Sequence, residues 1–323
     1  MTSPVMIEAR GLAKRFPVGG GLLRKPRLLH AVDGVDLEIR KGETFAIVGE
    51  SGCGKSTLAR LLMRLLEPTE GSIRIDGDDI STVGGAALKS LRRDVQFIFQ
   101  DPFSSLNPRL SVARLVGEPL EAHRPELSAS QRRDEVARLL RQVGLRPEHM
   151  DRYPHEFSGG QRQRIGIARA LILDPEVVVL DEPVSALDVS IRAQIINLLL
   201  DLQDRFGLSY LMISHDLSVV EHMSDRVLVM FFGQIVEQGG WQAIFEDPRH
   251  PYTMRLLDAI PNPATALHPA RQAHAVPPPP PGWAFGYDGS SAPNVLAPPE
   301  PSELVSVGGD HLVRLRKAQS AAA

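Results

Sequence analysis

The sequence predicts an α/β fold built on a largely parallel sheet, and three observations support that prediction. Apolar runs typical of buried strands recur along the chain, helical patterns lie between them, and a glycine cluster separates one strand from the helix after it. Strands that alternate with helices indicate a parallel sheet covered on both faces. The expected strands are 95–99, 177–180, 210–213 and 227–231, and the expected helices are 111–122, 130–143, 159–173 and 190–206.

The N-terminal elements follow from local patterns. Residues 32–48 first alternate and then run apolar, which predicts a hairpin that leads into a buried strand. A helix should follow the glycine cluster and end before Pro68. Its apolar positions have helical spacing and are Leu58, Leu61, Leu62, Leu65 and Leu66.

Changes in pattern along the chain suggest three parts. Helix signals dominate 101–173, so we expect a helical subdomain there, inserted into an α/β core formed by 1–100 and 174–260. Proline is frequent from Pro261 onward and includes a run at 277–281, so 261–323 is expected to be a mostly disordered tail. Residues 19–30 form a basic loop, either a solvated hairpin tip or a contact for lipid phosphates.

Composition excludes several classes of protein. The 323 residues are 43% hydrophobic with a formal net charge of −3, so no global basic field favours nucleic acid as a partner. No apolar run is long enough to span a bilayer, and the start lacks a signal-peptide core, so we expect a cytosolic chain. A single cysteine excludes an internal disulfide and a cysteine-ligated cluster, and the 10 histidines lack zinc-type spacing.

A phosphate-binding loop is the strongest single motif. Eight consecutive residues fit G-x-x-x-x-G-K-[ST] between a predicted strand and a predicted helix, and Thr57 completes the predicted site: Gly49, Glu50, Ser51, Gly52, Cys53, Gly54, Lys55, Ser56 and Thr57. Glycines let backbone N–H groups surround phosphates, Lys55 supplies a positive charge, and Ser56 offers a hydroxyl to Mg²⁺. Cys53 is either a reactive thiol or a tolerated small residue.

Two carboxylates follow a predicted buried strand. Asp181 and Glu182 end the run 177–180, where charges emerge from an apolar sheet edge. With a phosphate loop upstream, Asp181 is expected to hold Mg²⁺ and Glu182 to accept a proton from an attacking water.

The segment Phe157-Ser-Gly-Gly-Gln161 followed by Arg162-Gln-Arg-Ile-Gly-Ile-Ala-Arg-Ala170 resembles the signature of the ATP-binding cassette (ABC) family. The resemblance implies a P-loop NTPase (RecA-like) fold with an antiparallel β subdomain and an inserted helical subdomain. It also implies that two cassettes enclose two ATP molecules, each held by one phosphate loop and the other chain's signature. The signature residues expected at ATP are Ser158, Gly159, Gly160 and Gln161.

Four further residues match family elements in the expected order. Gln100 resembles the glutamine that touches Mg²⁺ and the attacking water, and His215 resembles the histidine that contacts the γ-phosphate. Asp188 ends a segment similar to the loop that crosses the dimer interface. Phe16 resembles the aromatic residue that stacks on adenine, although a phenylalanine in an N-terminal strand also suits the core.

Longer strings resemble one branch of the family, the oligopeptide and dipeptide importers. They are Gln100-Asp-Pro-Phe-Ser-Ser-Leu-Asn-Pro108, Tyr153-Pro-His-Glu-Phe157, Glu182-Pro-Val-Ser-Ala-Leu-Asp-Val189 and His250-Pro-Tyr-Thr253. This resemblance implies an ATPase at the cytoplasmic face of the inner membrane. Its partners would be a second cassette, expected to be a different chain, together with two membrane permeases and an extracytoplasmic solute-binding protein. Many members carry a cysteine-containing segment after the last string, which proline and small residues replace here.

Two alternatives belong to other functional classes. ABC ATPases that act on DNA place a coiled coil or zinc modules between loop and signature, but the stretch from Lys55 to Ser158 is compact and lacks heptads. A regulatory cassette that binds ATP without transport is disfavoured by intact Glu182 and His215. Neither the solute nor the choice between an identical and a different second cassette follows from the sequence.

Overall fold

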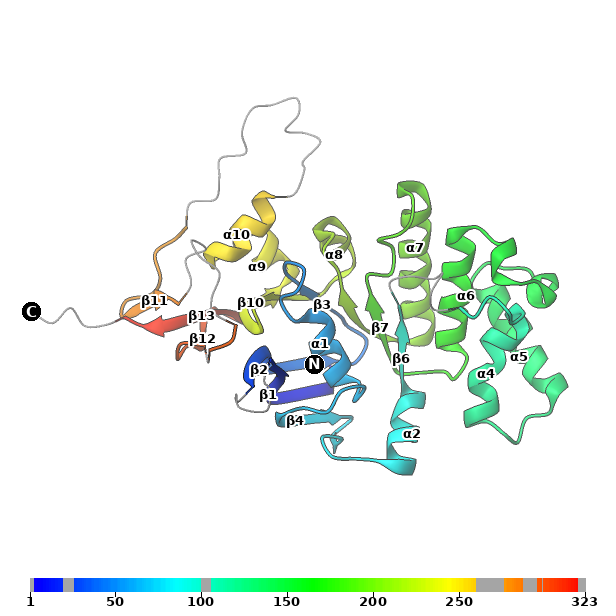
Figure 1. The fold of residues 1–323 in the computed structure, drawn as a ribbon. Helices are drawn as coiled ribbons and strands as arrows, with labels where there is room; N and C mark the ends of the chain where they lie inside the picture. The colour runs from blue at the N-terminus through cyan, green and yellow to red at the C-terminus, as the bar shows by residue number, and fades with distance from the viewer. Residues whose placement is uncertain are drawn as a thin grey trace, which may run out of the picture. The chain divides into compact units, whose positions relative to one another are not determined.

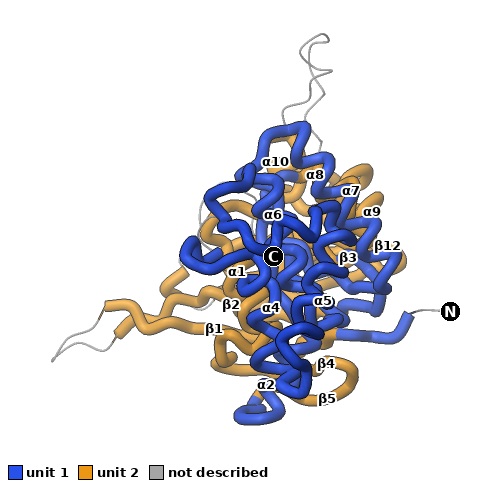
Figure 2. Tube along the Cα trace, turned by 90° about the vertical axis from the view of Figure 1, so that its right-hand side faces the viewer, with its two compact units in different colours: residues 1–6, 39–44, 82–216 blue, residues 7–38, 45–81, 217–323 orange. Residues whose placement is uncertain are grey.

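The computed structural model describes residues 3–19, 26–99, 106–259, 276–286, 295–297 and 299–318. It divides into two compact units (Figure 2). The first unit contains residues 1–6, 39–44 and 82–216, and the second contains 7–38, 45–81 and 217–323. This division differs from the predicted core and helical subdomain, because the first unit holds strands as well as the helical segment.

The first unit is built on three parallel strands. Strand β7 lies between β6 and β8, with Val95 opposite Val177 and Val177 opposite Ser209. Every residue of β7 and β8 is buried, which explains the continuous apolar runs that predicted them. The main elements of this unit are α2 (Gly85–Asp94), β6 (Val95–Ile98), β7 (Val177–Asp181), α7 (Val189–Phe206) and β8 (Ser209–Ile213).

The chain segment that connects β6 to β7 in the first unit is mostly helical. Helix α4 packs against both α5 and α6, and α6 packs against α7 (Figure 1). Leu115, Leu139 and Ile167 are buried on the facing sides of these helices. The helices are α4 (Val112–His123), α5 (Ala129–Gln142) and α6 (Gly159–Leu171), with 3₁₀ turns η1 (Pro147–Asp151) and η2 (Pro154–Glu156). The four helices predicted from periodicity are confirmed to within two residues at each end.

The second unit contains a four-stranded sheet in the order β2-β1-β4-β5. Strand β2 therefore pairs with β1 and not with the strand that follows it in the sequence. The prediction that residues 32–48 contain a hairpin is wrong. Helix α1 ends at Leu62, earlier than its apolar spacing predicted, because Arg64 adopts a left-handed backbone conformation with a φ of 51°. The elements are β1 (Val5–Val18), β2 (Arg27–Arg40), β3 (Thr44–Val48), α1 (Lys55–Leu62), β4 (Glu70–Ile75) and β5 (Asp78–Asp79).

The rest of the second unit is a mixed sheet with short helices. Strand β9 pairs in parallel with β3 and antiparallel with β10. The elements are α8 (Leu217–Met223), β9 (Arg226–Phe231), β10 (Gln234–Gly240), α9 (Trp241–Glu246) and α10 (Pro251–Asp258).

Three strands lie in the segment that its proline content predicted to be mostly disordered. They are β11 (Trp283–Phe285), β12 (Glu303–Gly308) and β13 (His311–Lys317). Strand β13 pairs antiparallel with β10, β11 and β12 (Figure 1). It alternates buried His311, Val313 and Leu315 with less buried residues, a strand pattern that lies after the last proline. Among the described residues, no helix combines the length and apolarity needed to cross a membrane.

Candidate functional site

The phosphate loop lies in the second unit, between β3 and α1, and its backbone requires glycine at two positions. Gly49 has a φ of 146° and Gly54 a φ of 110°, a range that disfavours other residues. A Cβ at Gly49 would lie 2.2 Å from the carbonyl oxygen of Met230, and one at Gly54 would lie 2.2 Å from that of Ala31. The loop is therefore packed tightly on one side, which fixes the path of its backbone.

Lys55 begins α1 and is buried beneath the loop. Its Nζ donates hydrogen bonds to the carbonyl oxygens of Gly49 at 2.7 Å and of Glu50 at 2.8 Å. A third, weak contact joins Nζ to Cys53 Sγ at 3.8 Å. A phosphate oxygen is a stronger acceptor than a thiol. The third N–H of the ammonium group is therefore the one best placed to donate a hydrogen bond to a nucleotide phosphate. Ser56 and Thr57 follow on the first turn of α1, half-buried.

Cys53 is buried within the loop, 4% exposed. Burial raises the pKa of its thiol, and the nearby Lys55 opposes this only in part. A buried thiol with a raised pKa carries little thiolate at neutral pH. Of the two interpretations of Cys53, the structure supports the tolerated small residue.

The acidic pair lies in the first unit, where β7 ends. Asp181 is its last residue and is 9% exposed. Glu182 follows with a φ of 50°, a conformation that costs a non-glycine residue about 1–2 kcal/mol. Its N–H donates to the carbonyl of Ile213 at 2.9 Å, which ties the strained residue to the end of β8.

Glu182 and His215 are brought together, a contact that the sequence did not predict. His215 Nδ1 lies 2.9 Å from Glu182 Oε1. The histidine side chain is 61% exposed and that of Glu182 is 17% exposed, so the imidazole is open to solvent while the carboxylate is mostly covered. The histidine can therefore orient the carboxylate while its other ring nitrogen remains accessible to a phosphate.

The signature forms the start of α6, also in the first unit. Ser158 caps the helix: its Oγ accepts from the N–H of Gln161 at 3.4 Å, and Gln161 Oε1 accepts from the N–H of Ser158 at 3.1 Å. A Cβ at Gly160 would lie 2.4 Å from Ile191 Cγ2, so α7 packs directly against this turn. The N–H groups of Gly159 and Gly160 stay at the helix N-terminus, where an anion is favoured.

The remaining predicted residues occupy separate places. Asp188 is exposed at the N-cap of α7 and makes no side-chain capping bond. Phe16 is half-buried in β1 of the second unit, with Lys14 Nζ 5.3 Å from its ring centroid. Gln100 lies outside the described residues. Phe16 and the phosphate loop thus belong to one unit, and the acidic pair, His215 and the signature belong to the other.

The residues present fit Mg²⁺ bound together with a nucleotide. The described part of the chain contains no group of three or more His, Cys, Asp or Glu side chains that could hold a metal alone. Mg²⁺ bound with phosphates needs no such cage, because it keeps water and phosphate oxygens as ligands and takes few from protein. A hydroxyl such as that of Ser56 and a carboxylate such as that of Asp181 are oxygen donors of the required kind.

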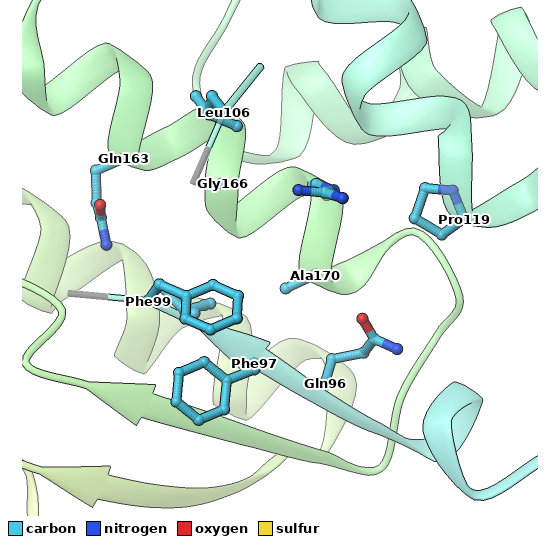
Figure 3. Close-up of a pocket in the computed structure, with 10 residues that line it drawn as sticks. Gln96, Phe97, Phe99, Leu106, Pro119, Gln163, Gly166 and Ala170 are labelled. Carbon is cyan, nitrogen blue, oxygen red and sulfur yellow. The ribbon is translucent and has the colours of Figure 1, made fainter. Parts of the chain in front are cut away.

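A cavity of about 180 Å³ lies in the first unit between β6, α4 and α6 (Figure 3). Phe97 and Phe99 form one wall, with ring centroids 4.4 Å apart, and Phe99 is 50% exposed. Gln163 lines the opposite side and is 2% exposed. Its Nε2 has no hydrogen-bond partner among the described residues. An apolar wall with a buried free donor is suited to contact another protein.

Sequence reasoning missed one residue at the phosphate loop. Tyr252 in α10 is fully buried, and its hydroxyl accepts a hydrogen bond from the backbone N–H of Glu50 at 2.9 Å. The only signal in the sequence was the string at 250–253, which carried a family resemblance and no assigned role.

Two family models match the chain. One is described as "ABC transporter" and covers residues 32–185. The other is described as "Oligopeptide/dipeptide transporter, C-terminal region" and covers residues 236–282. The second match includes α10 and the string at 250–253.

The chain is also similar to curated proteins over most of its length. It is 53% identical over 256 residues to the dipeptide transport ATP-binding protein DppF of Haemophilus influenzae, covering 79% of this chain and 78% of that protein. It is 54% identical over 258 residues to the oligopeptide transport ATP-binding protein AppF of Bacillus subtilis, covering 79% of this chain and 78% of that protein.

A solved structure shares the fold. It is described as a dimeric post-hydrolysis state of the ATP-binding cassette MJ0796 bound to ADP and Pi. The match has a TM-score of 0.65 and 30% sequence identity, and it covers 73% of this chain and 99% of that one. The predicted ABC cassette fold is confirmed.

Proposed function

This chain belongs to the ATP-binding proteins of dipeptide and oligopeptide ABC transporters, and from that premise we propose that it hydrolyses ATP to drive peptide import. The observation that carries the proposal is the phosphate loop, whose backbone requires glycine at 49 and 54 and whose Lys55 is buried beneath it. The names of the relatives and the matching C-terminal region support dipeptides or oligopeptides as the solute.

We assign nucleotide binding to the loop residues 49–57. Lys55 gives one N–H to the terminal phosphates, and the N–H groups at the start of α1 surround the others. Phe16, half-buried in β1, stacks on the adenine. Ser56, Asp181 and Gln100 would hold Mg²⁺, which would neutralise charge on the phosphates when bound.

We assign the proton-accepting role in hydrolysis to Glu182. Its carboxylate takes a proton from the attacking water, and His215 holds the carboxylate in place through the 2.9 Å contact. The backbone of Glu182 is held in a strained conformation just after β7, as is typical of residues at functional sites. Phosphoryl transfer requires little more from protein than an aligned water and compensation of charge.

The signature acts on the ATP of a second cassette. Ser158, Gly159, Gly160 and Gln161 form the start of α6, whose N–H groups match a phosphate. Asp188, exposed at the start of α7, lies on the surface that meets the partner. ATP binding closes the two cassettes on each other, and hydrolysis lets them part.

The permeases and the solute-binding protein complete the assembly. The cavity beside Phe97, Phe99 and Gln163 accepts a segment of a permease, because it offers an apolar wall and a buried amide donor (Figure 3). The chain then works at the cytoplasmic face of the inner membrane. Solute specificity lies in the permeases and the extracytoplasmic binding protein.

The experiment that tests this function compares Glu182→Gln with Glu176→Gln in the assembled transporter. Glu182→Gln should keep ATP binding but lower turnover by about 10²- to 10⁴-fold, the usual contribution of a positioned base. Glu176 is exposed and pairs with Lys41, so Glu176→Gln changes the same charge and should leave turnover unchanged. Near-normal turnover in Glu182→Gln refutes the assigned role.

A further inference from the structure

Tyr252 links the C-terminal region of the second unit to the phosphate loop. Its side chain is fully buried, and its hydroxyl oxygen accepts from the N–H of Glu50 at 2.9 Å. Glu50 is the second residue of the loop, 202 positions away in the sequence. Burial raises the pKa of Tyr252, so the group at the loop is a neutral hydroxyl.

The ring of Tyr252 is held firmly by its surroundings. His250 caps α10 by accepting from the N–H of Tyr252 through Nδ1 at 3.2 Å. Glu237 in β10 accepts from the N–H of Arg249 at 2.6 Å and from that of His250 at 3.0 Å. The Phe231 ring packs on the tyrosine with centroids 4.4 Å apart. These contacts fix where the hydroxyl lies.

The peptide groups of Glu50 are held from both sides. The Tyr252 hydroxyl accepts a hydrogen bond from the N–H of Glu50. The carbonyl of Glu50 accepts from Lys55 Nζ at 2.8 Å and from the N–H of Cys53 at 3.3 Å. The orientation of this residue therefore helps to set the position of the Lys55 ammonium. Loss of the hydroxyl leaves the N–H without its acceptor, and the loop can relax to find another.

We propose that Tyr252 is a positioning residue for the nucleotide: its hydroxyl fixes the Glu50 backbone, which holds Lys55 where the terminal phosphates bind. The C-terminal region that carries α10 is then a structural part of the nucleotide site. This proposal rests on the proposed function, since it assumes that the loop binds ATP.

The test compares Tyr252→Phe with Tyr210→Phe. Tyr210 is also buried, 1% exposed, and its hydroxyl donates to the Leu199 carbonyl at 2.8 Å, in the first unit. Both substitutions remove one buried hydroxyl hydrogen bond and keep the ring, so both should lower thermal stability by similar amounts. Only Tyr252→Phe should weaken ATP binding, with a rise in Kd of about tenfold.

The readouts separate positioning from stability. Titration of the full chain with a fluorescent ATP analogue gives Kd, and the ATPase activity of the assembled transporter gives KM and kcat. We expect Tyr252→Phe to raise KM with kcat unchanged within about twofold, as for loss of ground-state binding. If the wild type binds ATP and Tyr252→Phe binds as tightly as Tyr210→Phe, this inference fails and the proposed function stands. If the wild type binds no ATP, the proposed function fails.

Hydrogen exchange gives a second measurement that needs no variant. The Glu50 side chain is exposed, yet its amide should exchange slowly because Tyr252 accepts its proton in a buried place. The neighbouring Ser51 amide has no acceptor within the described ranges and should exchange fast. Equal exchange rates at Glu50 and Ser51 in the nucleotide-free chain would overturn the proposal, even if Tyr252→Phe failed to fold.

Discussion

The unfolding free energy should fall as the pH is lowered, because His250 is buried in its neutral form. The side chain is 1% exposed and caps α10, with Nδ1 accepting from the N–H of Tyr252. Burial, with the nearby Arg314 acting in the same direction, lowers the pKa of His250 to about 3. Protonation would turn Nδ1 into a donor and break the cap.

The sign and size follow from proton linkage. Between pH 3 and about pH 6.5, the ordinary pKa of histidine, the unfolded chain binds a proton that the folded chain excludes. The stability that neutral His250 provides is therefore complete above pH 6.5 and is lost as the pH falls toward 3. At pH 5 the loss relative to pH 7 is about 2 kcal/mol.

Urea unfolding at pH 7, 6 and 5 measures this loss. Other groups also titrate, so the control is His250→Asn, which removes the ionisable ring but keeps an oxygen acceptor suited to a helix N-cap. The pH dependence of the wild type should exceed that of His250→Asn by about 2 kcal/mol over this range. Parallel curves for the two proteins would refute the reasoning.

Three further outcomes are expected at the nucleotide site. Lys55→Ala should abolish ATP binding, whereas Lys41→Ala, which removes an exposed ion pair, should leave binding intact. A fluorescent-nucleotide titration that gives unchanged affinity for Lys55→Ala would contradict the phosphate-loop assignment. Ser158→Arg should impair hydrolysis at the site whose loop belongs to the other cassette, and full ATPase activity of the assembled variant would exclude that role. Alkylation of Cys53 should be slow at pH 7 and still rise by about tenfold between pH 8 and 9, because burial raises its pKa; a rate that levels off below pH 8 would oppose this.

Local patterns predicted the elements that carry the motifs. The glycines at 49 and 54 are a requirement of the loop backbone itself, and the start of α6 follows from a cap and its glycines, so both are visible in a short window of sequence. The buried strands β7 and β8 were equally visible as apolar runs. Signals confined to one element are the ones that a sequence displays directly.

Contacts between distant residues could not be predicted in this way. His215 meets Glu182 from 33 positions away, and Tyr252 meets Glu50 from 202 positions away. The local sequence around each of these residues gives no sign of the contact, because only the fold brings the two partners together.

The C-terminal strands were missed for a different reason. The prolines that precede them obscure a short alternating pattern, and β13 is held by pairing with β10 and by His311 Nε2, which lies 2.7 Å from Glu237 Oε1. Glu237 is fully buried and lies 74 positions earlier in the chain. A proline-rich segment that cannot form a core by itself can still contain strands, provided that these strands pair with an existing sheet.

The most direct test of the transport function is ATP-driven uptake of a labelled dipeptide or oligopeptide into proteoliposomes. The vesicles would contain this chain with its second cassette and permeases, and the binding protein would be supplied outside with ATP inside. We expect uptake that requires ATP and that Glu182→Gln abolishes while Glu176→Gln does not. Peptide uptake of equal rate with wild type and Glu182→Gln, or none with any peptide despite ATP hydrolysis, would contradict the account.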